Sequence, residues 1–419
     1  MMKKPRGVAD ILPGEVERWQ YLEGIIRELA RTYGYQEIRT PVFEFTELFQ
    51  RGVGEETDIV AKEMYSFPDR RGRSLSLRPE GTAPVVRAFV ENNLHTWPQP
   101  VKLYYVGPMF RYDRPQAGRW RQFHQFGAEA FGSADPALDT EVIALLMDFY
   151  AGAGLKGLTL ELNSVGCPEC RRELVVALRT YFSSRQEDLC RNCRERLERN
   201  PLRLLDCKEE GCRSLAAKAP VPLAFLCARC AAHFAAVKEG LAAYGINYTV
   251  NPHLVRGLDY YTGTAFEVLV PEIGAQSAIG GGGRYDNLVE ACGGPPVPGV
   301  GFAVGLERTL LALQQQGAGL PQAPQLEVFV VAAGEGVTGK VFEVLRLLRK
   351  AGIAADRDYL GRGLKGQLKQ AHRRGVQRVI ILGEEELQRG NVAVRAMDTG
   401  EQVEVAETEL IAWLKMQRA

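Results

Sequence analysis

The sequence has almost no net charge, no long apolar run and no leader-like start, and each absence excludes a class of protein. Its 52 Lys and Arg residues nearly balance its 51 Asp and Glu residues, which leaves a net charge of +1. That balance argues against a protein coated in basic charge, although it still allows a local basic face. No stretch has the roughly 20 apolar residues that a bilayer-spanning helix needs. The start, MMKKPRGVADILPGEVERW, has no apolar run behind its lysines, so we expect no signal peptide and a soluble, cytoplasmic protein.

The remaining composition is that of a folded, multidomain protein. Charged residues make up 25% of the 419 residues and hydrophobic residues 46%, ordinary proportions that predict little disorder and two to three domains. The stretch QQQGAGLPQAPQ (314–325) is a linker by composition. Beyond it, in residues 326–419, strand patterns alternate with helical patterns, which predicts a small α/β domain.

Residues 1–325 show a different pattern, dominated by short β-type runs. Segments 74–165 and 246–312 predict parts of one largely antiparallel sheet, with a segment inserted between them. Helical spacing of apolar residues predicts helices over 16–33 and 139–154, the second with an Asp/Thr start and a Gly stop. The whole chain is therefore expected to be a mixed α/β (α+β) fold.

The inserted segment, residues 166–245, is rich in arginine and mostly helical in pattern, and it holds eight of the nine cysteines. In a chain without a secretion signal, such cysteine pairs favour a metal site over a disulfide framework. CxxC pairs are typical of zinc knuckles, and eight cysteines could close two Cys₄ sites. We expect at least one structural Zn²⁺, with His233 as a further candidate ligand; the alternatives are one site plus spare thiols, or redox-labile pairs. The candidate ligands are Cys190, Cys193, Cys207, Cys212, Cys227 and Cys230.

Residues 110–129, FRYDRPQAGRWRQFHQFGAE, combine four arginines with aromatic residues in a strand–turn–strand pattern. The planar fork of a guanidinium group binds phosphate with two charge-assisted hydrogen bonds. An aromatic ring and a guanidinium group can also sandwich a base. The pattern therefore favours a nucleotide or RNA site over a solvated hairpin tip.

Two further patterns have less specific readings. The run GGGG (280–283) is not followed by Lys-Ser/Thr or by a helix, so it is no phosphate-binding P-loop, and we expect a strand whose backbone passes close to a ligand. Lys365, Lys369 and Arg373 recur at four-residue spacing and share one face of a predicted helix. That face is either simply solvated or in contact with RNA phosphates.

Several of these segments together resemble the class II aminoacyl-tRNA synthetases in their histidyl form. The arginine-rich hairpin FRYDRPQAGRWRQFHQFGAEAFG resembles motif two. EIRTPVFEF (37–45) resembles motif one and GVGFAVGLERTLLAL (299–313) motif three. The two histidine-specific signatures resemble LVRGLDYYTGTAFEV (254–268) and AIGGGGRYDNL (278–288). The segment LRPEGTAPVVRA (77–88) also matches. The resemblance covers essentially the whole chain. It implies a class II synthetase-type antiparallel catalytic domain (1–325), an inserted helical Cys-rich domain (166–245) and a C-terminal anticodon-binding domain (326–419).

The resemblance implies histidyl-tRNA synthetase activity. ATP and L-histidine would form histidyl-adenylate and pyrophosphate in the presence of Mg²⁺, and the histidyl group would then pass to tRNA(His). The family also implies a homodimer formed through motif one. The alternative is the non-catalytic, histidine-sensing regulatory subunit of ATP phosphoribosyltransferase, which normally lacks the C-terminal domain. Arg111, Arg308 and residues 326–419 favour the enzyme.

The resemblance also implies roles for individual residues, which group by the ligand they would meet. Arg256, Arg111 and Arg308 would be catalytic. ATP would contact Arg111, Arg119, Arg121 and Arg308. Histidine would contact Glu80, Thr82, Gln125, Glu129, Arg256, Tyr260, Tyr261 and Tyr285, although periodicity alone would make Tyr260 and Tyr261 a core pair. The tRNA acceptor end would contact Arg114 and Gln116, and its stem would lie near Arg191, Arg194 and Arg196.

Overall fold

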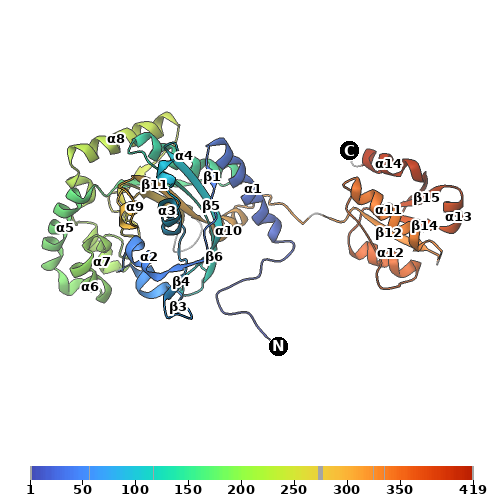
Figure 1. The fold of residues 1–419 in the computed structure, drawn as a ribbon, viewed down its shortest axis with the longest axis horizontal. Helices are drawn as coiled ribbons and strands as arrows, with labels where there is room; N and C mark the ends of the chain where they lie inside the picture. The colour runs from blue at the N-terminus through green and yellow to red at the C-terminus, as the bar shows by residue number, and fades with distance from the viewer. Residues whose placement is uncertain are drawn as a thin grey trace. The chain divides into compact units, whose positions relative to one another are not determined.

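The computed structural model describes residues 2–55, 57–116, 118–271, 277–323, 325–334 and 336–417. The chain forms two compact units, Met1–Gln322 and Ala323–Ala419 (Figure 1). Among the described residues, no helix combines the length and apolar character needed to cross a membrane.

The larger unit is built on an eight-stranded sheet whose central strands are all antiparallel. Parallel pairing occurs only at the two edges of this described sheet, β1 with β5 and β7 with β8. The predicted antiparallel sheet is therefore confirmed. In spatial order its strands are β1 (Gln36–Glu37), β5 (Val101–Phe110), β6 (Gln122–Phe131), β11 (Gly299–Gly305), β10 (Ala278–Arg284), β9 (Thr262–Leu269), β7 (Thr159–Ser164) and β8 (Thr249–Val250).

Four long helices contribute to the hydrophobic core on one face of this sheet: α1 (Val16–Thr32), α4 (Pro136–Ala153), α8 (Ala228–Ala243) and α10 (Leu306–Gln315). Helix α1 buries Trp19, Leu22, Ile26 and Ala30, the three- and four-residue spacing that predicted it. Helix α4 begins three residues earlier than predicted, because the Asp135 side chain accepts the Ala137 N–H (2.9 Å) and caps the helix. Its predicted end, before Gly154, is confirmed.

A separate three-stranded sheet corrects one expectation. Its strands are β2 (Phe43–Phe45), β4 (Ser74–Leu77) and β3 (Ser66–Pro68), in the order β2-β4-β3. The prediction that residues from 74 onward belong to the main sheet is wrong for β4. The chain changes sheets at Pro41, between β1 and β2, where proline cannot donate a ladder hydrogen bond. The Arg78 guanidinium holds this crossing by donating to the Thr40 carbonyl oxygen (2.9 Å).

The opposite face of the main sheet packs on a second core, which includes α3 (Thr82–Glu91) and α9 (Leu288–Ala291) and continues into the inserted segment. The segment forms α5 (Pro168–Ser183), α6 (Arg191–Arg199), the short 3₁₀ helix η5 (Pro201–Leu204) and α7 (Glu210–Ala216), and returns through α8. Helices α5, α6 and α7 group together beside the sheet (Figure 1). The predicted helical character of the segment is confirmed.

The smaller unit is a five-stranded sheet in the order β13-β12-β14-β15-β16, so the predicted α/β alternation is confirmed. Strand β12 (Val328–Ala333) pairs in parallel with β13 (Ala355–Arg357) and β14 (Arg378–Gly383). Antiparallel β15 (Asn391–Ala396) and β16 (Gln402–Ala406) complete the sheet. Its helices are α11 (Thr338–Lys350), α12 (Leu364–Arg373), α13 (Glu384–Gln388) and α14 (Leu410–Met416).

Helix α12 exposes Lys365, Lys369 and Arg373, while Gln367 and Ala371 are buried against the unit. The shared face predicted for the three cations is therefore present. Contact of this face with RNA stays a prediction.

Candidate functional site

The hairpin of β5 and β6 organises the site. The strands pair in register from Val101 with Phe131 to Phe110 with Gln122, which confirms the strand–turn–strand prediction. Arg111 follows the last pair, at the loop end of the hairpin, whereas Glu129 pairs with Leu103 near the opposite end of the strands. Arg111 and Glu129 both lie on the sheet face that packs on the second core, because Phe126, Ala128 and Ala130 point to the opposite, helix-covered face.

A cavity of about 340 Å³ at the loop end of the hairpin gathers arginine side chains from distant parts of the chain. Four of the predicted arginines line it: Arg111, Arg119, Arg256 and Arg308. The cavity also has aromatic walls, Trp120 and Phe123, and carboxylates at Glu63, Glu267 and Glu307. Such a concentration of guanidinium groups fits a polyanionic ligand such as a triphosphate.

Arg111 is fixed by two contacts before any ligand enters. Its Nε donates to the Pro79 carbonyl oxygen (2.8 Å), and its guanidinium carbon lies 5.2 Å from the ring centre of Phe123. Burial lowers the pKa of Arg111, since desolvation disfavours the charged form. A bound anion would offset that penalty.

Arg308 and Arg119 form the far side of the cavity. Arg308 donates to the Ala278 carbonyl oxygen, and Arg119 pairs with Asp113 at 2.8 Å. The pKa of Arg308 is lowered by burial and then by the positive charge of Arg119. Two cations this close favour a shared negative ligand.

Arg121 has a different position from the one predicted for it. It is absent from the residues that line the described cavity. Its guanidinium carbon lies 3.9 Å from the ring centre of Tyr112, and its Nη1 donates to the Arg6 carbonyl oxygen (3.4 Å). Arg121 therefore ties the hairpin to the N-terminal segment.

Arg256 lies where the arginine-lined cavity meets β9 and β10. It forms an ion pair with Glu267, and its Nε is buried without a hydrogen-bond partner among the described residues. Burial is the largest single effect and works against its charge, but Glu267, Tyr261 and Tyr260 together outweigh burial and raise the pKa of Arg256. A Cβ at Gly281 would lie 2.8 Å from Nη1 of Arg256. The glycine run thus forms a strand, as predicted, and at Gly281 it makes room for this arginine.

Glu129, on β6, is the centre of a buried cluster of carboxyl and hydroxyl groups. Its side chain is 0% exposed and accepts hydrogen bonds from the hydroxyl groups of Tyr285 and Thr82, the latter at 2.7 Å. Burial raises the pKa of Glu129 to about 8, against the lowering effect of three hydroxyl donors, those of Tyr285, Thr82 and Tyr105. Near neutral pH this carboxyl group can therefore act as a hydrogen-bond donor as well as an acceptor.

Glu80 and Gln125 are the polar groups next to this cluster. Glu80 accepts the N–H groups of Thr82 and Ala83, both at 2.8 Å, and caps the start of α3. Burial raises its pKa. The Oε1 atom of Gln125 is buried and has no hydrogen-bond partner in the part of the chain that the structure describes. An unsatisfied buried acceptor fits a ligand that carries N–H donors.

Three tyrosines pack around Glu129. The ring centres of Tyr260 and Tyr261 are 4.7 Å apart, and those of Tyr260 and Tyr285 are 5.6 Å apart. The Tyr261 carbonyl oxygen accepts from Arg171 of α5 at 2.7 Å. The eight residues predicted for histidine thus occupy one continuous region of the larger unit.

Arg114 and Gln116, the residues predicted to meet tRNA, lie in the exposed hairpin loop. Gln116 forms an isolated β-bridge with Arg119. Since Arg119 lines the arginine-lined cavity, its bridge partner Gln116 lies close to that cavity. In the inserted segment, Arg191 is 94% exposed at its side chain, whereas Arg196 pairs with Asp58 (2.8 Å) and Arg194 donates to the Leu189 carbonyl oxygen.

The lining of the cavity includes residues that the sequence did not predict, among them Arg203, Glu267 and Glu307. Glu267 and Glu307 interrupt apolar patterns, a signal that could have been used. Glu307 accepts the His124 N–H at 2.9 Å and so fixes β6 against α10. Arg203 comes from the inserted segment and donates to the Arg256 carbonyl oxygen (3.0 Å). Nothing in the sequence indicates this long-range contact.

Eight cysteines form two groups of four. Within each group, the sulfur atoms lie within 4.8 Å of one another. The first comprises Cys167, Cys170, Cys227 and Cys230, and the second Cys190, Cys193, Cys207 and Cys212. The six predicted ligands are thus divided between the groups, and Cys167 and Cys170 complete the first. His233 belongs to neither group, since its Nε2 lies 3.3 Å from Asp139 Oδ1.

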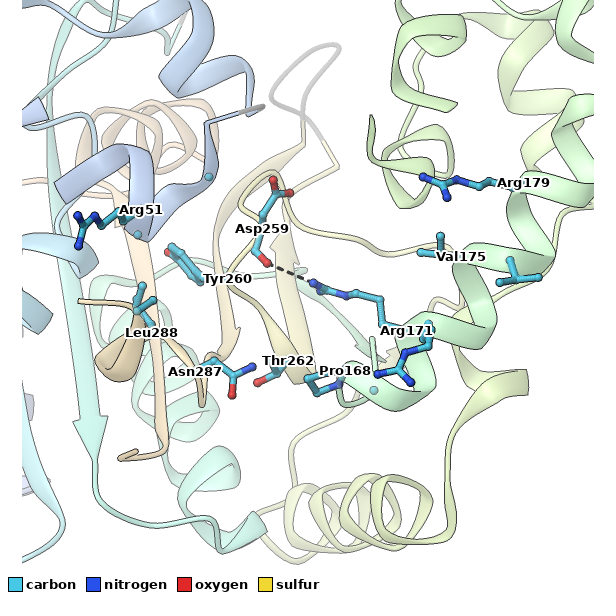
Figure 2. A pocket seen from close by; sticks show the side chains of 16 residues that line it. Arg51, Pro168, Arg171, Val175, Arg179, Asp259, Tyr260, Thr262, Asn287 and Leu288 are labelled. Atoms are coloured by element: carbon cyan, nitrogen blue, oxygen red, sulfur yellow. Dashed lines mark hydrogen bonds between the residues drawn. The ribbon is translucent and has the colours of Figure 1, made fainter. Parts of the chain in front are cut away.

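A second cavity, of about 530 Å³, lies between the inserted segment and the histidine-signature residues. Figure 2 shows Arg171, Val175 and Arg179 on α5 at one side, with Arg51 and Tyr260 facing them. Its wall therefore carries positive charge from two parts of the chain, and it reaches the tyrosine cluster.

The comparisons with known proteins agree along the whole chain. The family described as Histidyl-tRNA synthetase matches residues 7–309, and the family described as Anticodon binding domain matches residues 327–417. The histidine–tRNA ligase of Moorella thermoacetica is 61% identical over 405 residues, which are 97% of this chain and 96% of that protein. That of Pelotomaculum thermopropionicum is 60% identical over 412 residues, 98% and 97% of the two chains.

A solved structure gives the same result. The apo histidyl-tRNA synthetase of S. aureus aligns with a TM-score of 0.83 and 42% sequence identity, and the alignment covers 99% of both chains. These findings do not favour the regulatory-subunit alternative. Because the matches run through both units and every motif, the resemblance is confirmed and this chain belongs to the histidyl-tRNA synthetase family.

Proposed function

We propose that this chain activates L-histidine with ATP and transfers the histidyl group to tRNA(His) in the cytoplasm. A carboxylate oxygen of histidine attacks the α-phosphorus of ATP, and pyrophosphate leaves. A hydroxyl group of the terminal ribose of the tRNA then attacks the carbonyl carbon of the adenylate, and AMP leaves. The observation that carries the proposal is the arginine-lined cavity, whose lining includes both Arg256 and Gln125, the latter on the same face of β6 as the buried Glu129.

The cavity supports the first step by position and charge rather than by a protein nucleophile. Arg111 and Arg256 hold the α-phosphate and the attacking carboxylate, where negative charge develops in the transition state. Arg308 and Arg119 hold the outer phosphates. Since all four guanidinium groups are fixed by protein contacts, little reorganisation is needed when the reactants bind. Arg121 supports the hairpin from outside the cavity.

The buried cluster around Glu129 supports selection of histidine. Glu129 meets one imidazole nitrogen and Tyr261 the other, while Tyr260 and Tyr285 form apolar walls with polar edges. Glu80, Thr82 and the unsatisfied Oε1 of Gln125 receive the α-ammonium group. An amino acid without matching N–H groups would leave buried polar atoms unpaired, which is costly.

Mg²⁺ is the metal that this chemistry requires, and the donor chemistry of the cavity fits it. Glu63 and Glu267 line the cavity with carboxylate oxygens, the ligand type that Mg²⁺ prefers. Bound there, the ion would neutralise phosphate charge.

Charging of tRNA(His) by the purified chain tests the proposal. We expect labelled histidine to appear on tRNA(His) only when ATP is present, and no charging with other amino acids. A chain that binds histidine but gives neither adenylate nor charged tRNA would instead be a regulatory subunit.

For tRNA we propose three contact regions. The C-terminal domain (326–419) binds the anticodon arm, and the inserted domain (166–245) of the catalytic domain (1–325) lies over the acceptor stem. Arg114 and Gln116, exposed on the hairpin loop beside the cavity, contact the terminal base pair. The cavity of Figure 2 supports a path for the acceptor end, since it joins α5 to the tyrosines of the site.

Exchanging both Arg172 and Arg179 for alanine should weaken tRNA binding without affecting histidine activation. Both side chains are exposed on α5 and line this cavity, so each offers one phosphate contact. We expect the KM for tRNA to rise and the salt dependence of binding to fall by about one unit of slope per arginine. Arg27→Ala on α1, which removes an exposed arginine paired with Glu23, is the control. Unchanged tRNA binding in the double variant would exclude this path.

We further propose a homodimer formed through the motif-one region. The three-stranded sheet exposes apolar side chains in the single chain: Phe43 is 50% exposed and Phe45 48%. Neighbouring apolar residues of this kind mark an interaction surface.

Sedimentation should therefore give about twice the 46.4 kDa mass of one chain. Phe43→Glu combined with Phe45→Glu should shift the equilibrium to monomer, because two charges would be buried at the interface. Val176→Glu, which alters an apolar residue exposed on α5, should leave the dimer intact. A monomeric unmodified chain at micromolar concentration would contradict the proposal.

A further inference from the structure

The inserted segment contains two separate groups of four thiols. We call Cys167, Cys170, Cys227 and Cys230 the base cluster, and Cys190, Cys193, Cys207 and Cys212 the inner cluster. All eight thiols are free, and no disulfide is present in the described part of the chain. We propose that each cluster binds one Zn²⁺ through four thiolates, and that the inner zinc positions Arg203 at the arginine-lined cavity.

The sulfur geometry fits a single tetrahedral ion in each cluster. With zinc–sulfur bonds of about 2.3 Å, the sulfurs of a regular tetrahedron lie about 3.8 Å apart. The sulfurs of Cys167 and Cys170 are 3.5 Å apart, and those of Cys190 and Cys207 are 3.9 Å apart. A cuboidal iron–sulfur cluster would hold its cysteine sulfurs much further apart than the observed limit of 4.8 Å.

The backbone around the thiols also fits metal-bound thiolates. Cys167, Cys190 and Cys227 each occupy the N-cap position of a helix, so a CxxC pair lies in the first turn of α5, α6 and α8. The positive end of a helix favours thiolate over thiol. In addition, the Cys227 N–H donates to the Cys170 sulfur (3.1 Å) and the Cys190 N–H to the Cys212 sulfur (3.2 Å). Such donors to sulfur are the usual outer contacts of a thiolate metal site.

The base cluster joins the two places where the inserted segment meets the rest of the unit. Cys167 and Cys170 follow β7, where the chain leaves the sheet, and Cys227 and Cys230 begin α8, where it returns. A metal bound there fixes both crossings to each other. It thereby sets the orientation of α5, whose Arg171 donates to the Tyr261 carbonyl oxygen (2.7 Å).

The inner cluster stabilises short elements that bury little apolar surface. Helices α6 and α7 have nine and seven residues, too few to be stable by themselves. Cys193 and Cys207 are buried beside Leu197 and Leu204. Four unbound thiols would contribute little there, whereas a bound zinc ion adds directly to the folding free energy.

Arg203 links the inner cluster to the catalytic chemistry. The chain between Cys193 and Cys207 forms a loop closed by the cluster, and η5 on this loop carries Arg203. The Arg203 side chain reaches the Arg256 carbonyl oxygen (3.0 Å) and also pairs with Asp58 (3.7 Å). Arg203 is therefore a positioning residue for Arg256, a role that rests on the proposed function; metal binding does not depend on it.

Metal analysis of the purified full chain tests the two sites. We expect two zinc ions per chain, one for each cluster. Cys167→Ala and Cys190→Ala should each retain one, and Cys292→Ala, which alters the cysteine outside both clusters, should retain two. Replacement by Co²⁺ should give the absorption of tetrahedral cobalt thiolate. In the unmodified chain, a mercurial reagent should release two zinc ions into a coloured chelator, a measurement that needs no variant to fold.

Eight thiols that react freely in a metal-free, folded chain would overturn the proposal, as would disulfides in place of metal. If the unmodified chain holds one zinc ion, one cluster has no metal. It is the cluster whose cysteine variant still holds that one ion, and the proposal would be overturned for that cluster. For the positioning role, Cys190→Ala and Arg203→Ala should both reduce pyrophosphate exchange, by about tenfold. Arg203→Ala should keep two zinc ions. Full exchange in Arg203→Ala would overturn the positioning role and leave the metal sites standing.

Discussion

Replacing Arg256 by alanine should reduce histidine-dependent exchange of labelled pyrophosphate into ATP by about 10²–10³-fold. Arg256 combines an ion pair to Glu267 with a buried, unpartnered Nε in the described structure. The ion pair holds the guanidinium group in place, and the unpartnered Nε leaves a donor available at the arginine-lined cavity. Because the loss concerns charge that develops during the reaction, kcat should fall more than the affinity for either substrate.

Arg256→Lys separates charge from geometry. Lysine keeps the positive charge next to Glu267 but lacks the planar fork, so we expect it to recover only part of the activity. Arg27→Ala on α1 should behave as the unmodified chain, and thermal unfolding should confirm that both Arg256 variants fold. Full exchange in Arg256→Ala would remove this residue from the site.

Glu129→Gln should lower kcat/KM for histidine by about 10⁴-fold while it stabilises the free protein at alkaline pH. The loss of activity follows because a buried carboxyl group can either donate to or accept from an imidazole nitrogen, whereas the donor and acceptor atoms of an amide are fixed. Glu91→Gln at the end of α3, where the carboxylate is largely exposed and bonded to Arg87, is the control. Retained selectivity for histidine in Glu129→Gln would contradict the assignment.

The stability effect has a definite sign. The pKa of Glu129 is about 8 in the folded chain, raised by burial from an ordinary value of 4.5. Between these pH values the unfolded chain releases the proton and the folded chain keeps it, so the free energy of unfolding decreases as pH rises from 4.5 to about 8. At 1.36 kcal/mol per pKa unit, the loss is on the order of 4–5 kcal/mol. Calorimetry without histidine should show this slope in the unmodified chain and a smaller slope in Glu129→Gln.

The sequence predicted the hairpin that carries Arg111 and Glu129 because its pieces are local patterns. A strand–turn–strand pattern places Arg111 and Glu129 on one hairpin, and alternation along β6 determines which residues share a face. Glu267 could have been found in the same way, since it alternates with the buried Phe266 and Val268.

Long-range contacts account for what was missed. Arg121 has the spacing of its neighbours, but the N-terminal segment and Tyr112 hold it outside the cavity lining. Arg203 reaches Arg256 only after the inserted segment has folded against the sheet. The cysteine pairs do not group in chain order, because the pair at 167 and 170 joins the pair at 227 and 230 across the intervening cluster.

The register of β6 fixes the distance between Gln125 and Glu129, the residues proposed to bind the two ends of the amino acid. Gln125, Gly127 and Glu129 alternate with Phe126 and Ala128, which point into the helix-covered core, so their side chains share the site face at intervals of about 7 Å. A Cβ at Gly127 would lie 2.2 Å from the Tyr105 ring. The position between Gln125 and Glu129 therefore carries no side chain. Inserting one residue between Gln125 and Glu129 would turn Glu129 toward the core and leave the ammonium end unchanged. Under the roles proposed for Gln125 and Glu129, the hydrogen-bond ladder thus sets the length of side chain that the site accepts.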